Sequence, residues 1–246
     1  MRYFIEEELG ALSFFKGGIS MKIRILSALC IAIIATWVLL FIPHSVVSLL
    51  YVVICGFSIC EITYASIYSS AFSTKEFCRI EYIMIAFSAF AVTIFDNLLV
   101  GYLLVLCTLS DAGGYLAGKL LGKKAHRVGL LRDISPNKTW EGYLAGILCS
   151  IVLGLLCYWI LRNYLPTNGF WFAFFAWIPA IFGDLFESFL KRQLSIKDSA
   201  DGVMSSRCGL LRFVEKPMLS QGGYLDRMDS FVFTSIAYLI FYSFWQ

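Results

Sequence analysis

The sequence predicts an all-α polytopic integral membrane protein, and two observations support that prediction. Of the 246 residues, 59% are hydrophobic and only 15% are charged, whereas about a quarter of the residues in a soluble globular domain are charged. The apolar residues are also gathered into long runs, and a helix that crosses a bilayer needs roughly 20 such residues. The composition therefore excludes an ordinary soluble domain, and we expect no nucleic-acid partner.

Seven apolar runs predict about seven transmembrane helices. The third run is short for a span, so the predicted number is good to about one helix. In order, the runs lie at residues 23–42, 45–67, 80–95, 98–118, 143–161, 170–190 and 224–245.

The first 20 residues differ from the rest of the chain. Glutamates occupy positions 6–8, where a signal peptide would be basic. We interpret residues 1–20 as an N-terminal extension or as the product of a misassigned start, with Met21 as the alternative first residue. Residues 21–246 are then expected to form a single membrane-embedded domain.

The basic residues predict the orientation of this domain. With the N-terminus in the cytoplasm, every lysine and arginine except Arg162 falls in a cytoplasmic segment, as the positive-inside rule requires. We therefore expect an N-in topology with two polar loops, 119–142 and 191–223, on the cytoplasmic side.

A stripe of polar residues lies at the end of the sixth apolar run, in the segment GDLFESFLKRQ. In a helix, one face would carry Asp184, Glu187, Ser188, Lys191 and Arg192. A carboxylate at the centre of a membrane helix costs about 2.5–3.5 kcal/mol, which indicates a function such as binding a cation beside bases that bind phosphate. The alternative is an ion pair between Asp184 or Glu187 and Lys191 that only stabilises packing.

A second acidic pair begins the last apolar run. Asp226 and Asp229 lie three residues apart with Arg227 between them, and Gly222 and Gly223 precede them. Glycines allow a ligand to approach the backbone closely, and free N–H groups at a helix start can bind phosphate. Two facing acidic segments would form a metal clamp. The alternative is that these acids only favour the N-terminal end of the helix dipole.

The segment SDAGGYLAGKLLGKK contains a GxxxxGK pattern, but it is not a nucleotide-binding P-loop. Leu120 stands where a serine or threonine would bind magnesium. Gly114, Gly118 and Gly122 are instead expected to form a ridge for close helix packing. Asp111 on the same segment is either a functional acid or a hydrogen-bond acceptor in that packing.

Two further polar features have more than one interpretation. In the segment ISPNKTWEG, Lys138 and Thr139 offer a cation and a hydroxyl to phosphate, Ser135 begins a turn and Glu141 lies near a helix start. Helix capping explains this segment equally well. Glu61, late in the second apolar run, is either functional or simply reaches the membrane interface.

Taken in order, four segments resemble the signature of the phosphatidate cytidylyltransferase (CDP-diacylglycerol synthase) family. The resemblance covers residues 107–231, and its two C-terminal segments are the more specific. The segments are SDAGGYLAGKLLGKK, ISPNKTWEG, GDLFESFLKRQLSIKDS and GGYLDRMDS. The family implies an enzyme that transfers CMP from CTP to phosphatidate, giving CDP-diacylglycerol and pyrophosphate.

The resemblance also implies roles for individual residues. Asp184 and Asp226 would hold the metal, expected to be Mg²⁺, with a second cation left open. The other residues expected at the catalytic centre are Lys191, Arg192, Lys197, Asp198, Arg227 and Asp229. The residues expected to bind substrate are Asp111, Ser135, Lys138, Thr139, Glu141, Ser188, Gln221, Gly222 and Gly223.

Two features depart from the family. Gln221 stands where the family has a histidine, and glutamine can form a hydrogen bond but cannot carry a positive charge. An additional segment near 201–218 lengthens the stretch between Asp198 and Asp226. These departures leave open a related CTP-dependent membrane enzyme acting on another lipid, or a non-catalytic homologue.

The expected partners are CTP, phosphatidate and the surrounding membrane lipid. By the same resemblance, residues 21–246 would be one catalytic domain in a bacterial inner membrane, with its site facing the cytoplasm. The sequence leaves open whether the chain forms a homodimer.

Overall fold

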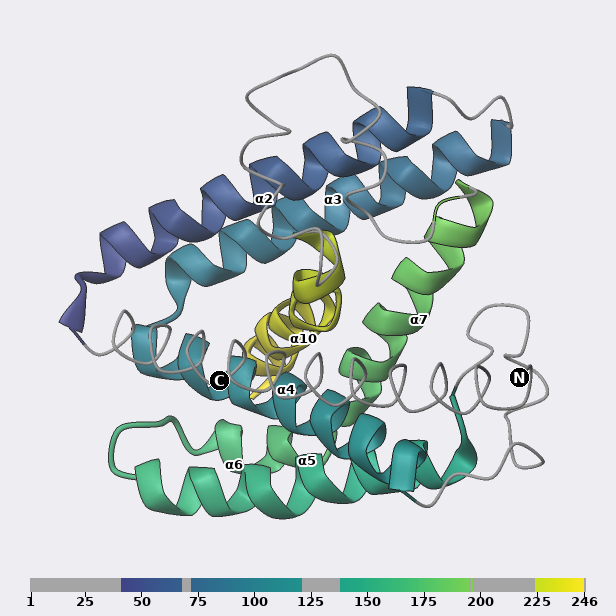
Figure 1. The fold of residues 1–246 in the computed structure, drawn as a ribbon. Helices are drawn as coiled ribbons and strands as arrows, with labels where there is room; N and C mark the ends of the chain where they lie inside the picture. Colours follow the sequence, from purple (N-terminus) through teal and green to yellow (C-terminus); the bar gives the residue numbers. More distant parts are fainter. Residues whose placement is uncertain (1–40, 68–71, 121–137, 195, 197–223, 246) are drawn as a thin grey trace, which may run out of the picture. The chain divides into compact units, whose positions relative to one another are not determined.

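The computed structural model describes residues 41–67, 72–120, 138–194, 196 and 224–245 (Figure 1). The contacts divide the chain into two units, Met1–Pro43 and His44–Gln246, and the elements below belong to the second. They are α2 (His44–Ile67), α3 (Phe72–Ile94), α4 (Asn97–Leu120), α5 (Trp140–Leu161), α6 (Asn168–Ala173), α7 (Trp177–Gln193) and α10 (Leu225–Phe244). The prediction of an all-α fold is confirmed.

Among these helices, four are long and apolar enough to cross a membrane, namely α2, α4, α5 and the Thr74–Ile94 part of α3. Met228–Phe244 of α10 adds a shorter apolar helix. Together they identify a polytopic integral membrane protein. The predicted span 23–42 lies almost entirely outside the described residues, so seven spans and the N-in orientation stay predictions, as does the predicted boundary at residue 20.

Two predicted spans differ from the observed helices. The third helix begins earlier than predicted, at Phe72. Its first turns carry charged residues, which a search for apolar runs does not detect. Two of them, Glu76 and Arg79, form an exposed ion pair of 2.6 Å. The sixth is divided into α6 and α7. Pro179 falls in the first turn of α7, where proline is tolerated, but its missing N–H and its ring disfavour one continuous helix through this region.

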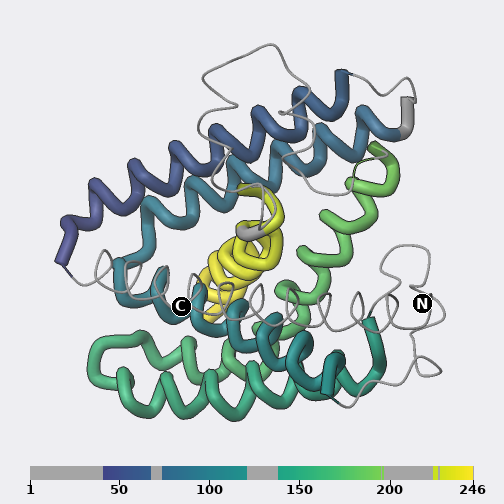
Figure 2. The backbone as a smooth tube through the Cα atoms, in the orientation of Figure 1, coloured from purple at the N-terminus to yellow at the C-terminus, as the bar shows by residue number. Residues whose placement is uncertain are grey.

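Successive helices alternate in direction. Figure 1 shows that α2 ends, α3 begins, α4 ends, α5 begins and α7 ends on the right-hand side of the view. Figure 2 shows α10 between the α2–α3 pair and the α4–α5 pair, and α10 contacts α2, α3, α4, α6 and α7. Helix α10 is therefore surrounded by other helices.

A chain of buried hydroxyl groups links three of these helices. The Tyr51 hydroxyl of α2 lies 2.6 Å from Ser88 Oγ of α3, which lies 2.7 Å from Ser235 Oγ of α10. Hydrogen bonds between helices satisfy polar groups that neither lipid nor apolar side chains can satisfy. The contacts help to hold α10 against the α2–α3 pair.

Small residues allow α4 and α5 to pack closely. A Cβ atom added to Gly146 would lie 2.7 Å from the carbonyl oxygen of Ser110, and one added to Gly142 would lie 2.8 Å from that of Gly114. Gly118 also faces α5, with its added Cβ 3.8 Å from Gly142 Cα. The predicted packing ridge is confirmed at Gly114 and Gly118, whereas Gly122 lies outside the described residues.

Gly183 has the same role between α7 and α10. A Cβ atom added to Gly183 would lie 2.5 Å from the carbonyl oxygen of Asp229 and 3.0 Å from Ser230 Cα. Real Cβ atoms do not approach backbone atoms so closely, so this position requires glycine. The contact places Asp184, the next residue of α7, beside the acidic start of α10.

We predict that Gly146→Val lowers stability, because the added side chain would force α4 and α5 apart. Overpacking of this kind costs about 1–3 kcal/mol, and the thermal unfolding midpoint of the protein in detergent measures it. Gly56→Val is the matched control, since a Cβ atom at Gly56 meets nothing within 4 Å. Equal midpoints for the two variants would contradict the packing argument.

We predict that Gly183→Ala separates α7 from α10 and exposes the Cys107 thiol. That thiol is buried and donates a 3.6 Å hydrogen bond to the Ser230 carbonyl oxygen, next to the contact point. Maleimide labelling of Cys107, measured by peptide mass spectrometry, should become faster than in the wild type and in a Gly56→Ala control. Unchanged labelling would show that α10 does not shift.

Candidate active site

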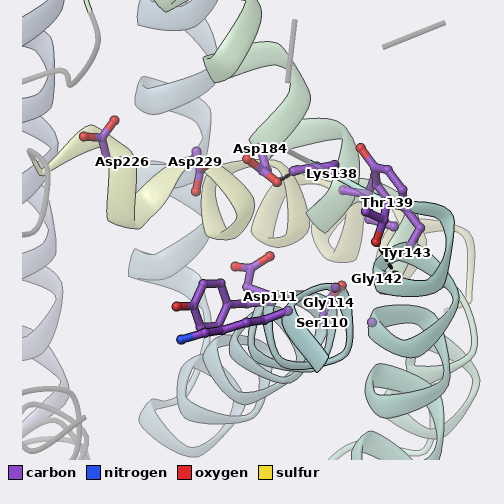
Figure 3. Close-up of a pocket in the computed structure, with 15 residues that line it drawn as sticks. Ser110, Asp111, Gly114, Lys138, Thr139, Gly142, Tyr143, Asp184, Asp226 and Asp229 are labelled. Carbon is purple, nitrogen blue, oxygen red and sulfur yellow. Dashed lines mark hydrogen bonds and ion pairs between the residues drawn. The ribbon is translucent and has the colours of Figure 1, made fainter. Parts of the chain in front are cut away.

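A pocket of about 550 Å³ lies between α4, α5, α7 and α10 (Figure 3). Its walls combine acids, lysines, hydroxyl groups and glycines, a mixture suited to a charged ligand. The polar lining residues include Asp111, Lys138, Thr139, Asp184, Asp226 and Asp229. All six were predicted from the sequence as site residues, and the fold brings them together from four separate segments.

The two acids of α10 differ in their surroundings. Asp229 is 7% exposed, and the Ser230 N–H donates a 2.6 Å hydrogen bond to its Oδ1. Asp226 lies one turn earlier, and Figure 3 shows it farther along α10 from Asp111 and Asp184. The pair therefore extends from the pocket toward the start of the helix.

Lysines form ion pairs with two of the acids that line the pocket, Asp184 and Asp226. Lys138 forms an ion pair with Asp184, and Lys191 lies 2.8 Å from Asp226 and 2.6 Å from Glu187. Such pairing reduces the cost of placing carboxylates in an apolar environment. The ion pair between Glu187 and Lys191 that the sequence left as an alternative is present, and it extends to Asp226 on another helix.

Lys138 is held at the pocket by the start of α5. Thr139 is the N-cap of that helix, and its hydroxyl oxygen accepts a 3.3 Å hydrogen bond from the Gly142 N–H. The ammonium of Lys138 lies 5.5 Å from the centre of the Tyr143 ring. Burial lowers the pKa of Lys138, and the carboxylates of Asp111 and Asp229 oppose that shift. Thr139 thus has the capping role that the sequence suggested as an alternative.

Several predicted residues do not line the pocket. Glu141, Ser188, Lys191 and Arg192 are absent from its walls, although Lys191 reaches it through Asp226. The side chain of Arg227 lies outside the described part of the chain. The same holds for all of Ser135, Lys197, Asp198, Gln221, Gly222 and Gly223 and for the segment 201–218.

The pocket also contains residues that were not predicted. Tyr115 and Lys119 line it one and two turns after Asp111, and Tyr143 lines it one turn after Thr139. A spacing of four residues places side chains on one helix face, so the helical pattern around the predicted residues would have found all three.

Glu61 contacts the start of α10, which the sequence did not predict. Glu61 does not reach the interface but is fully buried. Its carboxylate accepts hydrogen bonds from the N–H groups of Tyr224 and Leu225. These two N–H groups at the start of α10 are therefore occupied, while phosphate binding at this helix start stays a prediction.

The oxygen donors of the pocket suit magnesium. Mg²⁺ typically takes one or two protein carboxylates and completes its shell with water and substrate phosphates, which matches Asp184 and Asp226. Among the described residues, no group of three or more histidine, cysteine or acidic side chains is arranged as a complete metal cage. The metal site stays a prediction.

The chain is similar in sequence to curated proteins from several bacteria. The chain is 36% identical over 151 residues to a phosphatidate cytidylyltransferase of Helicobacter pylori, covering 59% of this chain and 48% of the relative. It is 37% identical over 134 residues to one from Synechocystis (54% and 38%) and 33% identical over 169 residues to one from Staphylococcus haemolyticus (66% and 57%). The chain thus spans about half the length of these curated relatives.

No solved structure matches the chain significantly. Residues 12–211, which are most of the sequence, match the model of a protein family described as "Cytidylyltransferase family". That range includes the first three of the four segments on which the resemblance rested. The chain therefore belongs to the cytidylyltransferase family.

Proposed function

We propose that this protein transfers CMP from CTP to phosphatidate, giving CDP-diacylglycerol and pyrophosphate. The observation that carries the proposal is the gathering of Asp184, Asp226 and Asp229 with Lys138 at one pocket of a membrane-embedded helical domain. Relatives named phosphatidate cytidylyltransferase support the choice of substrates.

The reaction needs no protein nucleophile. A phosphate oxygen of the lipid forms a new bond to the α-phosphorus of CTP, the bond between that phosphorus and the bridging oxygen breaks, and pyrophosphate leaves. Both reactants are polyanions, so the site must reduce their repulsion and stabilise the charge that develops during transfer. Lys138 and Lys191 are suited to bind phosphate oxygens once their pairing with carboxylates loosens.

Magnesium would be held by Asp184 and Asp226. When bound, it would neutralise charge on the phosphate oxygens and orient them for in-line displacement. These two carboxylates would fix its position, and Asp111 and Asp229 line the same pocket.

We propose that the pocket opens at the cytoplasmic face of a bacterial inner membrane. The distribution of basic residues supports this orientation, and bacterial relatives support the membrane. In this position phosphatidate can enter laterally from the bilayer, and CTP can enter from the cytosol.

We predict that Asp226→Asn lowers CMP transfer by roughly 100-fold or more, as expected when an electrostatic contact to the transition state is lost. The purified protein in detergent is incubated with labelled CTP, magnesium and phosphatidate, and lipid-linked CMP is measured. Glu76→Gln, which removes an exposed carboxylate of α3, is the matched control and should retain activity.

The same assay separates the alternatives. Product with phosphatidate supports the proposal. Product only with another lipid phosphate would identify a related enzyme of different specificity, and no product with any acceptor would indicate a non-catalytic homologue. Near-normal activity of Asp226→Asn would refute the role of that carboxylate.

A further inference from the structure

We propose that Glu61 is a positioning residue, which holds the first turn of α10 so that Asp226 and Asp229 can serve the pocket. The proposal rests on the proposed function for the role of the pocket, and on the geometry of α2 and α10 for the role of Glu61. Glu61 does not line the pocket, so it acts through the acids of α10 rather than on a ligand.

Each oxygen of the Glu61 carboxylate receives its own hydrogen bond. Oε1 accepts one of 2.7 Å from the Tyr224 N–H, and Oε2 accepts one of 2.9 Å from the Leu225 N–H. The next residue of the chain is Asp226. The carboxylate therefore binds two consecutive backbone N–H groups immediately before Asp226, the first acid of α10.

The start of a helix compensates for the burial of this carboxylate. Glu61 is fully buried, and a buried carboxylate is costly unless hydrogen bonds and favourable charge compensate. The N-terminal end of a helix supplies both, since its N–H groups point outward and its dipole favours negative charge. A neutral amide would lose the charge and could offer only one acceptor oxygen.

A second contact comes from the same face of α2. Phe57, one turn before Glu61, stacks on the Tyr224 ring with ring centres 5.2 Å apart and planes inclined by 19°. Residues four apart lie on one helix face, so α2 presents an aromatic ring and a carboxylate together to the start of α10. Two independent contacts make this an organised junction rather than an isolated hydrogen bond.

The junction complements the contact from α7. Lys191 holds the Asp226 side chain at 2.8 Å, while Glu61 holds the backbone just before it. Lys191 contacts the side chains of Glu187 and Asp226, whereas Glu61 contacts the backbone. Glu61 therefore fixes the backbone position from which the Asp226 side chain extends, whichever groups that side chain contacts.

The test compares full-length Glu61→Gln with the wild type and with Glu76→Gln. Binding of Mn²⁺, used as a spectroscopic substitute for Mg²⁺, is titrated by electron paramagnetic resonance without substrates. We expect Glu61→Gln to weaken the Mn²⁺ affinity by roughly tenfold or more, the usual effect of removing a residue that orients a metal ligand. Glu76→Gln should bind as the wild type does.

A purely structural role would give a different result. If Glu61 only supported folding, Glu61→Gln would reduce the number of Mn²⁺ sites per chain, because fewer molecules fold. The affinity of the remaining sites would not change. That outcome overturns the proposal. Glu61→Asp, which keeps the charge on a shorter side chain, should recover part of the affinity, and no recovery beyond Glu61→Gln would count against the charge argument.

Hydrogen–deuterium exchange makes the test independent of the metal. We expect the amides of the peptide 224–230 to exchange faster in Glu61→Gln than in the wild type, since one acceptor is lost. Unchanged exchange overturns the proposal even if the enzyme is active. If the wild type neither binds Mn²⁺ nor transfers CMP, the proposed function fails, while the exchange result still decides whether Glu61 holds α10.

Discussion

The contact on which the site depends is the bridge from Lys191 to Glu187 and Asp226. It brings one cation between carboxylates of α7 and α10, and the separate pair of Lys138 with Asp184 ties the start of α5 to α7. Isolated carboxylates would be too costly among apolar helices, so these lysines make the acidic pocket compatible with a membrane protein. The bridge also joins elements that are otherwise far apart in sequence.

Charges can meet in this way only because backbones approach closely. At Gly183 no side chain separates α7 from the backbone of Asp229, and glycines of α4 and α5 bring Asp111 and Thr139 to one pocket. In a membrane, helix association depends on packing and polar contacts rather than on the hydrophobic effect. The same glycines that stabilise the bundle therefore also determine the dimensions of the pocket.

Much of this could be predicted from the sequence because helical periodicity is local. It placed Asp184 and Lys191 on one face, and motif order selected the acids of α10. Contacts between distant residues left no such signal. The sequence left Glu61 open as a functional or an interface residue, and its contact with the backbone of Tyr224, 163 positions later, was not predicted. The break between α6 and α7 was also missed, because it falls inside the continuous apolar run that defined the predicted span.

The balance of acids and lysines at the pocket bears on how a nucleotide would bind under the proposed function. In the described part of the chain, acids that line or border the pocket outnumber the lysines; the acids are Asp111, Asp184, Glu187, Asp226 and Asp229, and the lysines are Lys119, Lys138 and Lys191. An excess of carboxylates attracts divalent cations and repels free nucleotide. Under the proposed function, CTP would therefore bind together with its cation. Glu61 lies outside the pocket lining and contacts the start of a helix, so it can position the acids of α10 without adding to the repulsion between the pocket and the nucleotide.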